Sequence, residues 1–127
     1  MRRSQDWLRQ AELDLATAGD NQRGGHHEWA CFAAQQAAEK AVKALHESGD
    51  RRLRSPSVVE LLGGLVGVPA DVMDAGKALD KHYLPARYPN FHPAGAPGDL
   101  YTAFEAERAL DDARHVIEHV RRHLPSA

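Results

Sequence analysis

The amino-acid sequence predicts an all-α fold, an antiparallel bundle of four or five helices. Three long segments repeat apolar residues at spacings of three and four, which places those residues on one face of an α-helix. No segment alternates apolar and polar residues as a half-buried strand does. Connections rich in glycine, serine or proline separate the segments, and helices joined in this way pack side by side in opposite directions.

Length and composition limit the class of protein. The chain has 127 residues, of which 43% are hydrophobic and 27% are charged, so we expect residues 1–127 to form one globular domain. A net charge of −2 argues against a general polyanion binder, and any contact with nucleic acid is expected to come from a local basic patch. Cys31 is the only cysteine, which excludes an intrachain disulfide and predicts a small buried side chain.

The apolar runs are short. None approaches the roughly 20 residues that a membrane-spanning helix needs, so no membrane partner is expected. Arg2 and Arg3 precede no apolar stretch of the kind found in a secretory signal. Together with the single cysteine, these features favour a cytoplasmic location.

The first two helices are predicted from their apolar faces. The first spans about Asp6–Ala18, and Gly19 is expected to end it in the left-handed conformation. The second spans about Glu28–Glu47 and is expected to be the most buried, because a stripe of small residues lets neighbouring helices approach closely. This stripe is Ala30, Ala34, Ala37, Ala41 and Ala44, with Trp29, Phe32 and Leu45 adding bulk beside it.

Two shorter helices are predicted next. Residues 57–65 form the third, since Ser57 and Glu60 have the spacing of a capping box. Pro69 suits the first turn of the fourth. The predicted inner face of the fourth helix is Val72, Gly76, Leu79 and Tyr83.

The remainder divides into a loop and a long helix. Leu84–Gly98 has no helical pattern, and a loop of this length in a small domain is often functional. Its prolines, which each block a helix interior, are Pro85, Pro89, Pro93 and Pro97. The last helix is predicted over about Leu100–Leu124, with Asp99 as its N-cap. Its apolar face is Ala103, Ala106, Leu110, Ala113, Ile117, Val120 and Leu124.

Several segments carry a resemblance to a known family. Residues 36–44 read Gln-Ala-Ala-Glu-Lys-Ala-Val-Lys-Ala, which resembles the second helix of the HEPN family of helical domains. Residues 7–18 resemble the first helix of that family, and residues 57–62 its short third helix. Residues 83–89, Tyr-Leu-Pro-Ala-Arg-Tyr-Pro, resemble the segment before its last helix. The resemblance covers nearly the whole chain in the right order.

The resemblance implies partners and an activity. HEPN proteins commonly form two-fold dimers, so a homodimer is expected. Many are encoded beside a small nucleotidyltransferase, as a toxin with its antitoxin, which implies a cognate nucleotidyltransferase as a second partner. Active members are endoribonucleases that need no metal, so neither a metal nor another cofactor is expected.

Arg87 and His92 are the candidate catalytic residues. The nuclease motif of the family is an arginine followed, after four to six residues, by a histidine, and this pair has that spacing. RNA cleavage without metal needs a base for the 2′-hydroxyl proton, which a histidine supplies near neutral pH. It also needs a cation for the phosphorane charge, and the planar arginine fork matches phosphate oxygens. One site holds a single histidine, so the general acid is expected to be a second His92 across a dimer.

A non-catalytic alternative stays open at this loop. The nuclease branch of the family usually has a small polar residue after the arginine and a tyrosine soon after the histidine, whereas Tyr88 and Pro93 follow here. Pro56 also replaces a histidine that often precedes the third helix. In this alternative, Arg87 caps the fourth helix or pairs with an acid, and His92 is exposed. The dimer then binds a nucleotide or a partner nucleotidyltransferase. A purely structural helical dimer is a third reading.

Five further residues are candidate contacts for RNA or a nucleotide. Arg51, Arg52 and Arg54 form a basic turn that suits phosphate oxygens, although such runs are usually just solvated. Tyr88 and Asn90 lie in the same loop as the catalytic candidates.

Two other polar sets have spacings that bear on function. His115, His119 and His123 are spaced by four, but the helical wheel places them opposite the apolar face, so a solvated surface is expected rather than a metal site. Gln36, Glu39 and Lys40 lie on the most buried helix, either in an interface or cleft or at its exposed edge, and Glu39 has ion-pair spacing to Lys43.

Overall fold

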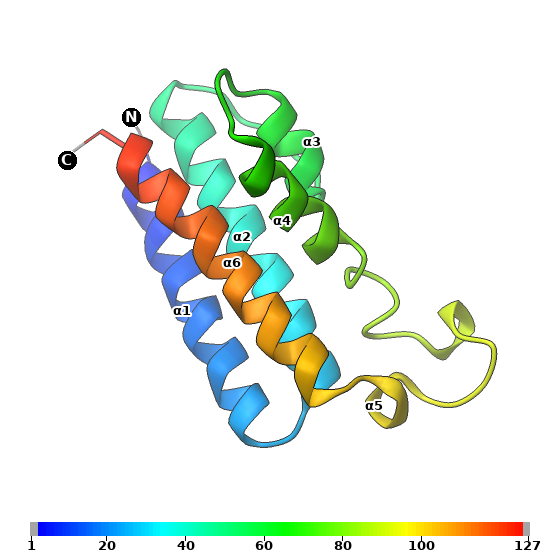
Figure 1. Ribbon diagram of the computed structural model, residues 1–127. Coiled ribbons are helices and arrows are strands. Elements are labelled where there is room, and N and C mark those ends of the chain that lie inside the picture. Colours follow the sequence, from blue (N-terminus) through cyan, green and yellow to red (C-terminus); the bar gives the residue numbers. More distant parts are fainter. Residues whose placement is uncertain (1–2, 126–127) are drawn as a thin grey trace.

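The computed structural model describes residues 3–125, and within them every regular element is helical (Figure 1). Four longer helices run alternately up and down: α1 (Ser4–Arg23), α2 (His27–Ser48), α4 (Ala70–Asp80) and α6 (Ala103–His123). Three short elements join them: α3 (Val58–Gly63), the 3-10 helix η1 (Pro89–Phe91) and α5 (Pro97–Leu100). The predicted all-α bundle is therefore confirmed, with α3 as the fifth packed helix and α5 outside the bundle.

Helix α2 is the centre of the bundle, as predicted. It packs along α1 on one side and α6 on the other, and it also contacts α3 and α4. The predicted alanine stripe is fully buried, as is Cys31. Small side chains let α1, α3, α4 and α6 approach α2 closely. Trp29, expected to add bulk beside the alanine stripe, is 47% exposed.

The predicted end of the first helix was wrong. α1 continues through Gly19, which is buried inside the helix, and ends at Arg23 with Gly24 as its C-cap. The left-handed conformation falls instead on Gly25, where φ is +80°. At Gly19 an added Cβ would meet only the end of the exposed Arg23 side chain, at the ordinary contact distance of 3.4 Å.

The start of α3 is tied to the end of α4. Ser57 caps α3 as predicted, its hydroxyl accepting from the Glu60 amide at 3.0 Å. Asp80, the last residue of α4, accepts from the amides of Val58 at 2.9 Å and Val59 at 3.0 Å. Because α4 ends there, Tyr83 lies in the following turn and not on the helical face predicted for it.

The segment predicted to lack helix holds η1 and the first half of α5. Pro89 and Pro97 stand at the first positions of these elements, where a missing N–H costs no hydrogen bond. α6 therefore begins at Ala103 and not at Leu100. Its N-cap is Thr102, which forms a reciprocal capping box with Glu105, while the predicted cap Asp99 lies within α5.

Candidate functional site

The turns after α4 carry Arg87 to the side of α2. The Arg87 amide donates to Leu84 O at 3.0 Å, and the Tyr88 amide donates to the same oxygen at 3.2 Å. The Arg87 guanidinium then lies over three aromatic rings. Its distances to the ring centroids are 4.2 Å for Phe32, 4.8 Å for Tyr83 and 5.2 Å for Tyr88. These rings form an aromatic cage that stabilises the cation through their π faces.

The Arg87 charge has no acidic partner within residues 3–125. Its Nε donates to the main-chain oxygen of Tyr83 at 2.9 Å, and no carboxylate of the described chain forms an ion pair with it. The guanidinium is thus held by three rings and one carbonyl, and its terminal nitrogens have no hydrogen bond within the described residues. Of the two structural alternatives, the pairing of Arg87 with an acid is not found. The bond from Nε to Tyr83 O, in the turn that follows α4, is close to the other one, in which Arg87 caps the end of that helix.

His92 is anchored and partly buried, so it is not the freely exposed side chain of the alternative reading. Its Nε2 lies 2.7 Å from the main-chain oxygen of Pro85. A carbonyl only accepts hydrogen bonds, so Nε2 carries the proton and donates it. In the neutral ring, Nδ1 is therefore the nitrogen with a free lone pair.

The turn Tyr83–Pro85 holds both candidate catalytic side chains. Arg87 donates to the first carbonyl of this turn and His92 donates to the last. Tyr88, 45% exposed, is part of the aromatic cage, and Asn90 is exposed in η1. These four predicted site residues are neighbours in the sequence, and what the structure adds is that Arg87 and His92 are both bonded to the turn Tyr83–Pro85.

Sequence reasoning missed three residues beside this loop. Phe32 and Tyr83 complete the aromatic cage. The spacing of four between Tyr83 and Arg87 was a local signal for Tyr83, whereas Phe32 lies on another helix and had none. Tyr101 packs its ring against His92, with centroids 6.3 Å apart and planes at 80°. No sequence signal connects these two, because they are nine residues apart across α5.

The basic turn lies elsewhere. Figure 1 shows the connection between α2 and α3 at the opposite end of the bundle from η1 and α5. Arg51 donates to the main-chain oxygen of Gly64 at 3.0 Å, Arg52 pairs with Glu47 at 3.1 Å, and Arg54 is exposed. The arginines of this turn are not part of the Arg87 and His92 site.

The histidines of α6 do not form the solvated row that was predicted. His119 is only 4% exposed, because α6 packs on α1, α2 and α4 over an arc wider than the predicted stripe. Its buried Nδ1 has no hydrogen bond within the described residues, and burial lowers its pKa. His115 Nε2 lies 2.6 Å from Asp71 Oδ2. The described residues contain no cluster of three or more side chains suited to a metal ion.

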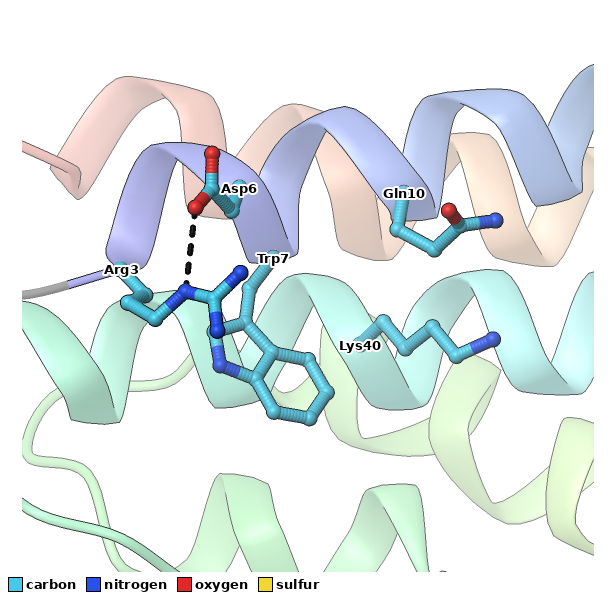
Figure 2. Close-up of a pocket in the computed structure, with 5 residues that line it drawn as sticks. All are labelled: Arg3, Asp6, Trp7, Gln10 and Lys40. Atoms are coloured by element: carbon cyan, nitrogen blue, oxygen red, sulfur yellow. Dashed lines mark hydrogen bonds and ion pairs between the residues drawn. The ribbon is translucent and has the colours of Figure 1, made fainter.

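The polar residues of α2 are buried or half-buried, and several of them pair with one another or with α1. Gln36 donates to Glu39 at 3.0 Å, and the predicted ion pair of Glu39 and Lys43 is present at 2.8 Å. Lys40 pairs with Asp14 of α1. A shallow pocket further along α2 is shown in Figure 2 and lies near the start of α1, away from Arg87. Its lining is Arg3, Asp6, Trp7, Gln10 and Lys40.

Comparison with known proteins finds one family and several solved structures. The family model described as HEPN domain matches residues 4–123. The structure of TT1696 from Thermus thermophilus is 46% identical, with a TM-score of 0.95, covering 98% of this chain and 100% of that one. The archaeal HEPN homologue ST0689 is 38% identical, with a TM-score of 0.85 and the same coverages. A HEPN domain protein from Thermotoga maritima is 33% identical, with a TM-score of 0.76, covering 92% and 95%.

Two negative results accompany these matches. No curated protein matches the chain. No helix within residues 3–125 is both long enough and apolar enough to cross a membrane.

Proposed function

The chain belongs to the HEPN domain family, and we propose that it is an endoribonuclease that cleaves RNA without a metal ion through Arg87 and His92. The observation that supports this most directly is the anchoring of both side chains to one turn. Each uses one nitrogen for a main-chain carbonyl, which leaves the terminal nitrogens of Arg87 and Nδ1 of His92 for a substrate.

The reaction follows from these free atoms. His92 Nδ1 takes the proton of a ribose 2′-hydroxyl, and the 2′-oxygen attacks the adjacent phosphorus. Arg87 stabilises the negative charge that develops on the phosphorane oxygens. The 5′-oxygen leaves with a proton, and the products are a 2′,3′-cyclic phosphate and a 5′-hydroxyl. We assign the leaving-group proton to His92 of a second copy, so the proposal includes a two-fold homodimer.

The biological role is proposed from the family. We propose that the chain acts in the cytoplasm as the toxin of a HEPN and nucleotidyltransferase pair, with a cognate nucleotidyltransferase as its antitoxin. Growth arrest on expression of the chain alone, relieved when the neighbouring nucleotidyltransferase is expressed with it, is the expected result. Unchanged growth would leave the nuclease without a toxin role.

Exposed aromatic residues favour a second candidate function. Tyr88, which contacts Arg87, Trp29, which contacts Phe32, and Phe91 of η1 are 45–47% exposed. Their rings would stack on bases or on a partner protein even if no bond is cleaved. The second candidate is thus a HEPN dimer that binds a nucleotide, an RNA or a nucleotidyltransferase, with Asn90 as a further contact. The Arg51, Arg52 and Arg54 turn, at the other end of the bundle, would be a separate contact that only an RNA or a partner protein is long enough to reach.

One assay separates the two functions. End-labelled RNA is incubated with wild-type protein in EDTA, and the products are tested for a 2′,3′-cyclic phosphate. Cleavage that depends on His92 supports the nuclease. Binding without cleavage over a panel of RNAs would replace it with the binding module, and light scattering on the same sample tests the dimer.

A further inference from the structure

Tyr101 lies between two histidines that are distant in the sequence. It connects α5 to α6 and packs its partly buried ring against the core. The centroid of its ring is 5.4 Å from that of His82 and 6.3 Å from that of His92. Its hydroxyl is hydrogen-bonded to His82 Nδ1 at 2.9 Å. One end of the tyrosine is therefore anchored while its ring meets His92 at an angle of 80°.

The pair of Tyr101 and His82 is uncharged near neutral pH. Burial lowers the pKa of His82, with Glu105 acting in the opposite direction. Burial also raises the pKa of the Tyr101 phenol, and nearby Glu105 adds to this. The pair consequently holds its geometry through a hydrogen bond and ring packing, and it adds no charge beside His92.

His92 needs a second contact to fix the direction of its base. The hydrogen bond from Nε2 to Pro85 O fixes one atom, but the imidazole can still turn about that bond. The edge-to-face contact with Tyr101 restricts this rotation and so restricts the direction of Nδ1. Orientation matters because a misplacement of about 1 Å can cost about 10²-fold in rate.

We propose that Tyr101 is a positioning residue for His92 and that His82 holds Tyr101 in place. The proposal rests on the proposed nuclease function, since it explains how the candidate base is aimed. The turn after α4, the α5–α6 connection and the loop after η1 then act together on one imidazole ring.

Kinetics of three variants test the role in catalysis. Tyr101→Ala removes the ring and is expected to lower kcat by up to about 10²-fold with little change in KM, since the contact to substrate is untouched. Tyr101→Phe keeps the ring and loses only the anchor to His82, so its loss is expected to be smaller. Thr102→Ala is the matched control, because it removes the N-cap of α6 at the neighbouring residue but keeps the rings of Tyr101 and His92. An equal loss of kcat in this control would overturn the proposal.

The nitrogen chemical shifts of His92 test the orientation of its ring even if the protein cleaves no RNA. In ¹⁵N-histidine spectra the wild-type protein should show His92 mainly protonated on Nε2, and Tyr101→Ala should show mixed or broadened signals. If wild-type protein cleaves no RNA but the spectra change as expected, the nuclease proposal fails and the positioning contact stands. If wild-type protein cleaves RNA while Tyr101→Ala keeps both kcat and the His92 signals, the positioning role is overturned and the nuclease stands. If Tyr101→Ala does not fold, kcat and the His92 nitrogen shifts are measured in Tyr101→Phe and His82→Phe instead.

Discussion

The guanidinium of Arg87 lies 4.2 Å from the centroid of the Phe32 ring, and this contact joins the turn after α4 to the body of α2. Phe32 also touches Tyr83, with centroids 6.2 Å apart, and Trp29, with centroids 6.0 Å apart. The candidate site is thus built on the most buried helix of the bundle, although the residues proposed for catalysis lie in a loop.

Replacing Phe32 by leucine should lower RNA cleavage without leaving a large cavity in the core. Leucine keeps apolar bulk but removes the π face under Arg87, which is worth about 0.5–2 kcal/mol in such contacts. RNA cleavage should fall several-fold, with a small drop in melting temperature. Phe104→Leu is the control, because Phe104 is 64% exposed and lies 5.8 Å from Arg108 in a second arginine–phenylalanine pair. Equal effects of the two variants would show that Phe32 acts through general packing.

Replacing Arg87 separates charge from geometry. Arg87→Ala should lower RNA cleavage by about 10²–10³-fold, since the phosphorane would lose its charged donor. Arg87→Lys should recover only part of this, because an ammonium cannot make the bidentate contact or spread over three rings. If the wild-type protein cleaves no RNA and Arg87→Ala melts at a lower temperature, Arg87 has a structural role only.

Replacing His92 tests the base directly. His92→Ala should lower cleavage by about 10²–10⁴-fold in EDTA and leave the helical circular dichroism spectrum unchanged. His115→Ala is the matched control: His115 is also exposed in part and bonded through Nε2, but it pairs with Asp71 on the α4–α6 side. Cleavage that persists in His92→Ala would remove this residue from the mechanism.

Replacing Asp80 should destabilise the fold. Its carboxylate accepts from two amides at the start of α3, from the Ser57 hydroxyl at 2.9 Å and from Gln35 Nε2 at 3.1 Å. Asp80→Ala leaves the amides of Val58 and Val59 without their acceptor, while Gln35 Nε2 keeps its bond to Pro56 O. A loss of about 2 kcal/mol or more in the free energy of unfolding is therefore expected in urea. Asp74→Ala, on the exposed side of the same helix, should change that free energy by less than about 0.5 kcal/mol. Similar values for both would mean that the cap contributes little.

Lowering the pH from about 8 to 5 should lower the melting temperature. Burial holds the folded-state pKa of His82 and His119 below the ordinary value of 6.5. Below that value the unfolded chain binds more protons than the folded chain, so this stability is present at higher pH and is lost on acidification. His119→Leu should flatten the dependence of melting temperature on pH, whereas His26→Leu, at an exposed position, should not. An identical slope in His119→Leu would assign the effect to other groups.

The helices could be predicted from the sequence because helical periodicity and capping depend on residues close together in the chain. The alanine stripe of α2 and the Ser57 cap of α3 depend on spacings within one or two turns, and both are as predicted. Capping at α6 was misassigned by three residues, because Asp99 and Thr102 are both good N-caps and only the packing of α5 decides between them. The helix also continues through Gly19, which is buried, so the glycine by itself did not mark the end of α1.

By itself, the sequence determined the helical pattern, the order of the helices and the spacing of Arg87 and His92, because periodicity, capping and motif spacing are properties of neighbouring residues. Tertiary structure alone decided that Phe32 lies under Arg87, that Tyr101 meets His92 and that His119 is buried. These contacts join residues from different helices and turns. They depend on how the helices pack and where the chain turns, which no local pattern specifies.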